Sequence, residues 1–136
     1  MSEFILNTQG NTALDAFAAG YVEAMFFTNG DTGDENENSL NDLGVERLSK
    51  KALARIKAEC AAFQDTHAAL LAEACKGDYD AAQAGRDFWF TRQGHGVGYW
   101  DREALPDTLR GKLSEAARAA GESTVFTQRG WIHIDN

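Results

Sequence analysis

Long hydrophobic runs, a basic N-terminal stretch and abundant cysteine are all missing from this 136-residue sequence. No apolar run approaches the ~18–20 residues that a membrane span needs, so no membrane contact is expected. The N-terminus has no basic region and too short an apolar stretch for a signal peptide, which leads us to expect a cytoplasmic protein. Only two cysteines occur, in keeping with a reducing compartment, and a chain of this length folds without disulfides or metals.

The composition is that of one globular domain. Hydrophobic residues make up 43% of the chain, charged residues 25% and aromatic residues 10%, a mixture that disordered and fibrous chains do not have. Globular domains commonly contain about 100–150 residues. We therefore expect a single domain spanning residues 1–136.

Basic residues are absent from the N-terminal third. The first 46 residues contain nine acidic residues and no Lys or Arg, whereas the remaining 90 contain twelve acidic and thirteen basic residues. The formal net charge of −8 therefore arises entirely before Arg47. Such a surface repels nucleic acid and attracts a basic protein surface, with an association that weakens as salt rises. The alternative interpretation is a solvated loop that only aids solubility.

Apolar residues at spacings of three and four predict two N-terminal helices. The first is expected to follow an N-cap at Thr12 and to end near Asn29, and the second to span residues 49–76. Two apolar stripes of this kind favour an antiparallel helical hairpin. Between the helices, the polar stretch at about 29–42 predicts an exposed acidic loop.

Period-two alternation begins after Gly85 and predicts a β-hairpin. In residues 86–92, Phe88 and Phe90 would share one face of a strand. The glycine-rich turn at 93–96 would follow, and residues 97–101 would return as the second strand.

A third helix and a second hairpin complete the predicted fold. The helix is expected to open at Pro106 and to end before Gly121. Residues 124–128 and 131–135 flank Arg129-Gly130, a hairpin signal. The order favours an α+β fold, in which the N-terminal helical hairpin packs on a small antiparallel sheet made of two β-hairpins joined by the third helix.

Reactive side chains are densest around the glycine-rich turn. A small-molecule or nucleotide site there would use the side chains of Arg92, His95, Trp100, Asp101 and Arg102. The two arginines could hold a phosphate or carboxylate, and the flanking glycines would leave His95 accessible. A catalytic version would use His95 as general acid or base, oriented by Asp87 or Asp101. The competing interpretation is a structural hairpin whose Asp and Arg side chains pair across strands, and no catalytic residue is assigned.

No metal site or cofactor is expected. The three histidines, His67, His95 and His133, fall on different predicted elements without the spacing of a helical zinc motif. Cys60 and Cys75 would lie about 22 Å apart on one helix, too far for a disulfide or a shared metal. Phosphate-loop, nucleophile-elbow and basic aromatic patterns are missing, so nucleotide hydrolysis, esterase chemistry and direct nucleic-acid binding lack support.

Segment 87–102, DFWFTRQGHGVGYWDR, resembles the signature of small acidic proteins encoded by bacteriophages, prophages and mobile elements. The resemblance extends to the Tyr21-Val22-Glu23-Ala24 part of the first helix, the acidic loop, the helix that contains Phe63 and the final aromatic strand. It implies a phage-derived origin in a host cell, with the Arg92 to Arg102 hairpin as the characteristic surface of the family. It implies no catalytic assignment.

The favoured functional hypothesis is a phage-derived accessory protein that binds a basic surface on a host defence or nucleic-acid-processing protein and inhibits it. The partner-binding residues would be Asp31, Asp34, Glu35, Glu37 and Asp42. The alternative is the small-molecule or nucleotide site around His95. A third possibility is a homodimeric virion or packaging accessory, with a self-interface formed by Trp89, Trp100 or Trp131.

Overall fold

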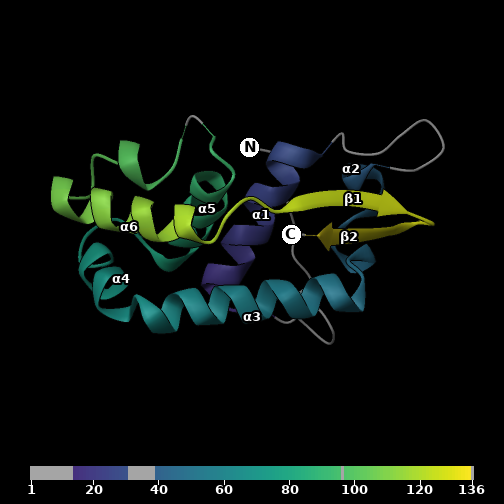
Figure 1. The fold of residues 1–136 in the computed structure, drawn as a ribbon, viewed down its shortest axis with the longest axis horizontal. Coiled ribbons are helices and arrows are strands. Elements are labelled where there is room, and N and C mark those ends of the chain that lie inside the picture. The colour runs from purple at the N-terminus through teal and green to yellow at the C-terminus, as the bar shows by residue number, and fades with distance from the viewer. Residues whose placement is uncertain (1–13, 31–38, 96, 136) are drawn as a thin grey trace.

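The computed structural model of the chain describes residues 14–30, 39–95 and 97–135 (Figure 1). In chain order the elements are α1 (Ala16–Asn29), α2 (Leu40–Leu43), η2 (Val45–Arg47), α3 (Lys50–Thr66), α4 (Ala68–Ala74), α5 (Ala81–Arg92), η3 (Tyr99–Asp101), α6 (Asp107–Ala119), β1 (Thr124–Gln128) and β2 (Trp131–Asp135). The two strands pair antiparallel, so the chain is α+β. Figure 1 shows α3 along one long side, with α6 and the β-hairpin towards opposite ends.

Helix α1 confirms the first predicted helix. Its N-cap is Asp15, not Thr12, because the Asp15 carboxylate accepts a hydrogen bond of 2.8 Å from the Ala18 N–H group. The apolar residues expected to face the core within this helix are buried, namely Phe17, Ala18, Tyr21, Val22, Met25 and Phe26. The main packing partner differs from the expectation, however: α1 packs chiefly against α5, and α3 contacts only part of it.

The α1–α5 crossing depends on two glycines. A Cβ atom on Gly20 would collide with the Ala82 carbonyl, and one on Gly85 would collide with the Phe17 carbonyl. Both positions are helical, where glycine costs about 1 kcal/mol relative to alanine. The glycines are therefore explained by the close approach of the two helix backbones.

The long second helix is interrupted. Ser49 caps α3 as expected, since its hydroxyl accepts from the Ala52 N–H group at 3.0 Å. The helix ends at Thr66, and His67 leaves the helical region with φ −113° and ψ 28° before α4 begins. The His67 ring lies 4.8 Å from that of Phe63, which anchors the junction to the core.

The predicted strand at 86–92 is wrong, because these residues form the end of α5. The Asp80 carboxylate caps this helix by accepting from the Gln83 N–H group at 2.8 Å. From Asp87 to Arg92 every residue is buried, so the run has no solvent-facing side. A helix buried on all sides shows no amphipathic period, and its alternating aromatics imitated a strand.

The predicted return strand at 97–101 is also wrong. Its last three residues form η3, in which Tyr99 is fully buried and donates from its hydroxyl to the Ala84 carbonyl at 2.7 Å. The first of the two predicted hairpins is therefore replaced by a helix, a loop and a short 3-10 turn.

The third helix and the second hairpin are confirmed. Helix α6 opens after Pro106 and is followed by Gly121 at φ 78°. The β1–β2 pairing runs from Thr124 with Asp135 to Gln128 with Trp131. Beyond β2, the Ser49 N–H group donates to the Ile132 carbonyl at 2.9 Å, which ties the hairpin to the start of α3.

An aromatic cluster joins these elements in the core. The Phe63 and Phe88 rings stack at 4.1 Å, and Tyr21 meets Trp89 edge-on at 5.3 Å. Trp89 is fully buried, so it cannot form the self-interface of a homodimer.

No helix among the described residues is both long and apolar enough to cross a bilayer.

Candidate functional site

The carboxylate of Asp87 is the centre of a buried polar cluster. Asp87 has no exposed surface and accepts from the Tyr79 hydroxyl at 2.6 Å and the Gln83 amide at 3.1 Å. Arg102 donates to both carboxylate oxygens, at 2.7 Å from Nη2 and 3.0 Å from Nε. This paired geometry is the strongest form of an Arg–carboxylate contact. The cluster therefore fixes the segment after η3 against α5.

Two pKa shifts follow from this cluster. Burial, reinforced by the adjacent Asp87 carboxylate, raises the pKa of Tyr79 far above its ordinary value of 10.0. Hydrogen bonding to Asp87 raises the pKa of Arg102 despite partial burial. Tyr79 therefore remains a neutral donor and Arg102 remains charged.

Arg92 forms a second internal cluster. Its guanidinium donates to Glu59 at 2.8 Å, to the Tyr21 hydroxyl at 3.1 Å and to the carbonyls of Ala120 and Gly121 at 3.1 and 2.7 Å. Burial alone would lower the pKa of Arg92, but Tyr21 and Glu59 outweigh it and raise the pKa. The two carbonyls follow the end of α6, so Arg92 also completes the C-terminus of that helix.

The structure thus uses both arginines of the proposed ligand site internally. Arg102 pairs with Asp87, as the structural interpretation expects, although the pair joins α5 to the segment after η3 and does not cross two strands. Arg92 pairs with Glu59 of α3. A phosphate that binds either guanidinium would be repelled by the carboxylate that already pairs with it.

The other motif residues lie outside these clusters. His95 is exposed, and its ring meets that of Phe90 edge-on at 6.0 Å. Asp101 accepts from the Gly98 N–H group at 3.0 Å, and Trp100 is exposed. Asp87, which the catalytic version places beside His95, instead serves Tyr79 and Arg102.

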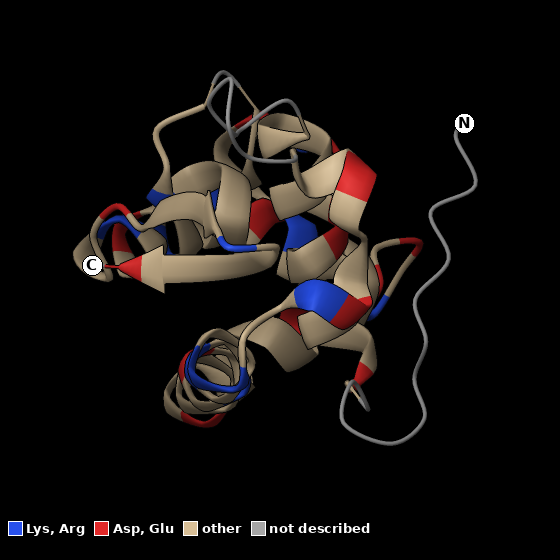
Figure 2. Cartoon of the chain, turned by 90° about the vertical axis from the view of Figure 1, so that its right-hand side faces the viewer, with Lys and Arg blue, Asp and Glu red and all other residues tan. Residues whose placement is uncertain are grey.

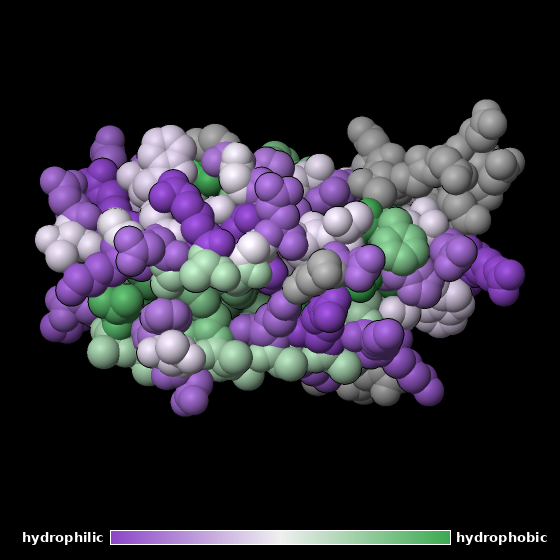
Figure 3. Space-filling view, in the orientation of Figure 1, coloured by the Kyte–Doolittle hydropathy of each residue, from purple (hydrophilic) through white to green (hydrophobic). Residues whose placement is uncertain are grey.

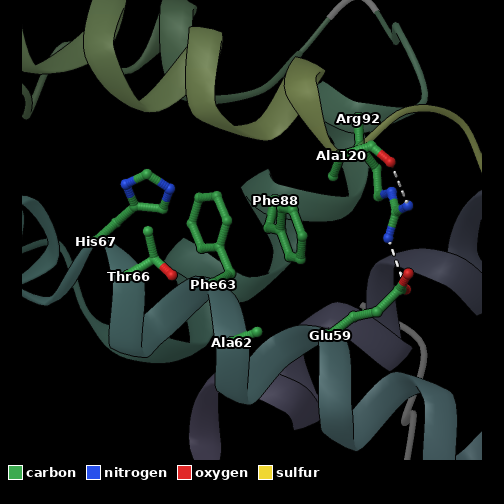
Figure 4. Close-up of a pocket in the computed structure, with 8 residues that line it drawn as sticks. All are labelled: Glu59, Ala62, Phe63, Thr66, His67, Phe88, Arg92 and Ala120. Atoms are coloured by element: carbon green, nitrogen blue, oxygen red, sulfur yellow. Dashed lines mark hydrogen bonds and ion pairs between the residues drawn. The ribbon is translucent and has the colours of Figure 1, made fainter.

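A cavity of about 250 Å³ opens between α3, α5 and the end of α6. Figure 4 shows the rings of Phe63 and Phe88 at its centre, with His67 at one end and the Arg92–Glu59 pair at the other. The remaining lining residues are Ala62, Thr66 and Ala120. Hydrophobic side chains gather over α3 and α4 on this face of the molecule (Figure 3). Ligand pockets usually measure about 300–1,000 Å³, so the cavity suits a small planar molecule at most.

Most of the acidic residues that the sequence predicts to bind a partner lie outside the described residues, namely Asp31, Asp34, Glu35 and Glu37. Asp42 is exposed on α2, where its carboxylate completes a capping box with Ser39. Figure 2 views the end that carries α2 and the hairpin, and its described ribbon holds acidic and basic residues side by side.

Phe27 is a surface feature that the sequence analysis missed. It is 82% exposed on the last turns of α1, whereas its neighbour Phe26 is buried. The Asn41 N–H group donates to the Gly30 carbonyl at 3.1 Å, so α2 returns to the same end of α1. An exposed phenylalanine therefore stands where the acidic segment leaves and rejoins the described chain. No signal in the sequence marks this exposure, because Phe27 directly adjoins the apolar stripe of α1.

Tyr79, Gln83 and Glu59 were also missed as partners of the motif. A helix that starts at Asp80 would have placed Gln83 and Asp87 four residues apart on one face. The predicted strand at 86–92 instead placed Asp87 on a different element from Gln83. The Glu59–Arg92 pair joins residues 33 positions apart, and no local pattern indicates it.

Among the described residues, no group of three or more His, Cys, Asp and Glu side chains is arranged to hold a metal ion. Comparison of the chain with protein-family models, with curated proteins and with solved structures gives no match.

Proposed function

We propose that this chain is a phage-derived accessory protein that acts in the host cell by binding a basic surface of another protein and blocking it. The binding surface consists of the acidic segment, Asp31, Asp34, Glu35, Glu37 and Asp42, together with Phe27 at its base. The observation that carries the proposal is the 82% exposure of Phe27 beside the most acidic part of the sequence.

This combination suits a protein interface in two ways. A large aromatic side chain that is exposed in the free protein can bury much apolar surface on binding, and aromatic residues commonly act as anchors of an interface. Acidic residues around such an anchor accelerate association with a basic partner and select against acidic ones. The proposed surface thereby specifies the charge of the partner.

The internal contacts of the motif residues also favour protein binding over catalysis. Asp87, Arg92 and Arg102 already have partners within the protein. A catalytic acid or base needs access to a substrate, and His95 has no carboxylate among its described contacts. The 87–102 segment is therefore better explained as a structural element that holds α5 to its neighbours than as an active site.

The proposal is tested by capture from a lysate of the bacterial host with tagged protein, at about 50 mM and about 500 mM salt, followed by mass spectrometry. One variant neutralises Asp31, Asp34, Glu35 and Glu37 as Asn or Gln. The matched control removes the same number of charges from exposed positions elsewhere, at Asp65, Asp78, Glu103 and Glu115.

We expect a partner that the wild type and the control retain at low salt, that high salt releases, and that the first variant does not capture. Equal capture by both variants would contradict the acidic surface. Capture that high salt strengthens would contradict an electrostatic interface.

The cavity supports a second candidate function, the binding of a small planar molecule between the Phe63 face and the Arg92–Glu59 pair. Indole is a suitable probe, followed by chemical shifts of the lining residues. Filling the cavity with Ala62→Phe should abolish the shifts and leave protein capture unchanged. The same shifts in Ala62→Phe and in the wild type would contradict a site in this cavity.

A further inference from the structure

The outer edge of β1 has the features of a strand that can pair with another chain. Among the described residues, β1 pairs only with β2, whereas β2 also contacts Leu48 on its other side. All five β1 residues, Thr-Val-Phe-Thr-Gln, are uncharged and keep their N–H groups. Natural edge strands usually carry a charge, a proline or a bulge that prevents pairing with another chain, and β1 has an unbroken register without any of these.

The turn determines which backbone groups face this edge. Arg129 and Gly130 have φ values of 55° and 80°, the two positive values of a type I′ turn. In such a turn the flanking pair, Gln128 with Trp131, is hydrogen-bonded. Because hydrogen-bonded and non-hydrogen-bonded pairs alternate along an antiparallel ladder, Val125 and Thr127 direct their N–H and C=O groups away from β2.

The N–H and C=O groups that point away from β2 are placed so that a second β1 strand can pair with them. An antiparallel copy centred on Phe126 places Val125 opposite Thr127 of the other copy, so that both residues exchange N–H to C=O hydrogen bonds on each side of the two-fold axis. It is the centre at which all five residues of both strands are paired. Shifting the centre to Val125 or Thr127 keeps the hydrogen-bond phase but leaves strand ends unpaired.

The side chains complement each other in the same register. Val125 and Thr127, both buried beneath the sheet, would meet on the inner face. Phe126, which is 39% exposed, would meet its own copy on the outer face as a close aromatic pair. The turn with Arg129 would lie beside Glu122 of the other copy, which places opposite charges at both ends of the contact.

We propose that two copies of this chain pair through β1, antiparallel and centred on Phe126, to form one continuous four-stranded sheet. The partner is thus a second copy, recognised by main-chain hydrogen bonds, by the Phe126 pair and by the Arg129–Glu122 contacts. This dimer does not depend on the proposed host partner, because Phe27 and the acidic segment take no part in it.

Disulfide trapping in the full chain tests both the contact and its register. The background is Cys75→Ser, which removes the exposed thiol, while Cys60 is buried. In a non-hydrogen-bonded antiparallel pair the Cα atoms are about 4.5 Å apart, a spacing that a disulfide accepts. Under mild oxidation Phe126→Cys should therefore convert to a covalent dimer.

Two further variants control for the register. Thr124→Cys alone and Gln128→Cys alone should form no disulfide cross-link, because each introduced thiol would lie about 13 Å along the strand from its own copy. An equal mixture of these two variants should cross-link, because Thr124 lies opposite Gln128 of the other copy. Circular dichroism and urea midpoints confirm that each variant is folded.

Sedimentation equilibrium of the unmodified chain completes the test. The mass should rise from 14.9 kDa towards twice that value between about 5 and about 500 µM. Phe126→Lys, which sets two ammonium groups opposite each other, should weaken dimerisation by about tenfold or more. A constant monomer mass, or cross-linking of Thr124→Cys alone as fast as that of Phe126→Cys, would overturn the proposal.

Discussion

Two segments with similar sequence patterns fold differently in this protein. The sequence predicts that residues 86–101 and 124–135 each form two short strands around a turn that contains glycine, yet the first forms the end of α5, a loop and η3, and the second forms the β-hairpin. The difference lies in burial. Both faces of the first segment are buried between Asp87 and Arg92, whereas the hairpin keeps one exposed face.

The turns also differ. The hairpin has two adjacent residues with positive φ, Arg129 and Gly130, whereas in the first segment Gly94 and Gly98 are four residues apart. A two-residue hairpin with a type I′ turn requires adjacent positive φ values. The comparison teaches that alternation predicts a strand only where one face can stay solvated and the turn chemistry agrees.

The largest expected effect is that of Asp87→Asn in the first segment. It would leave the Arg102 guanidinium without its charged partner beside the core, and breaking a buried pair in this way costs about 3–5 kcal/mol. Arg102 is partly exposed, so the lower end of that range is expected. Urea unfolding measures the loss.

The matched hairpin variant is Asp135→Asn, at an exposed strand end. Its free energy of unfolding should stay within about 0.5 kcal/mol of wild type. Equal losses of unfolding free energy for the two variants would contradict the difference between a segment held by buried polar contacts and a hairpin at the surface.

Gly85→Ala should have the next largest effect. The new Cβ atom would collide with the Phe17 carbonyl, and overpacking of this kind costs about 1–3 kcal/mol. Gly111→Ala in α6 is the control, because nothing lies within 4 Å of its Cβ position. It should stabilise the protein by up to about 1 kcal/mol through helix propensity. Stabilisation by both substitutions would contradict the close α1–α5 crossing.

Gly130→Ala tests the turn that distinguishes the hairpin. At φ 80° an alanine is strained by about 1 kcal/mol or slightly more. Thermal unfolding should show this loss as a lower melting temperature. An unchanged melting temperature would contradict the assigned turn conformation.

The smallest effect is expected for His95→Ala. The side chain is exposed and its described ring contact is with the edge of Phe90, so the free energy of unfolding should change by less than about 0.5 kcal/mol. A loss of unfolding free energy above about 2 kcal/mol would show that the imidazole makes structural contacts like those of Asp87 and Arg92.

Local signals were sufficient for much of the fold. Apolar stripes placed α1, α3 and α6, the cap at Ser49 placed the start of α3, and the Arg129-Gly130 turn placed the hairpin. The sequence did not reveal α5 as a helix, because its final residues are buried on all sides and therefore lack the amphipathic period of a helix. The break at His67 was also invisible, because the apolar stripe continues through it.

The candidate site was less predictable than the fold. The sequence brought attention to Asp87, Arg92 and Arg102, and these residues are indeed the centres of the polar clusters. Their partners, Tyr79 and Glu59, come from other elements and depend on tertiary packing. Phe27 needed the structure, because an apolar residue next to an apolar stripe does not reveal its exposure until the helix is packed.

The central claim is that partner binding depends on the Phe27 end of the molecule and not on the 87–102 segment. Capture from host lysate with Phe27→Ser and with His95→Ala tests it most directly, since both side chains are exposed and neither substitution should unfold the chain. The account predicts that Phe27→Ser loses the captured partner and that His95→Ala retains it. Retention by Phe27→Ser together with loss by His95→Ala would contradict the account and return the binding site to the glycine-rich loop.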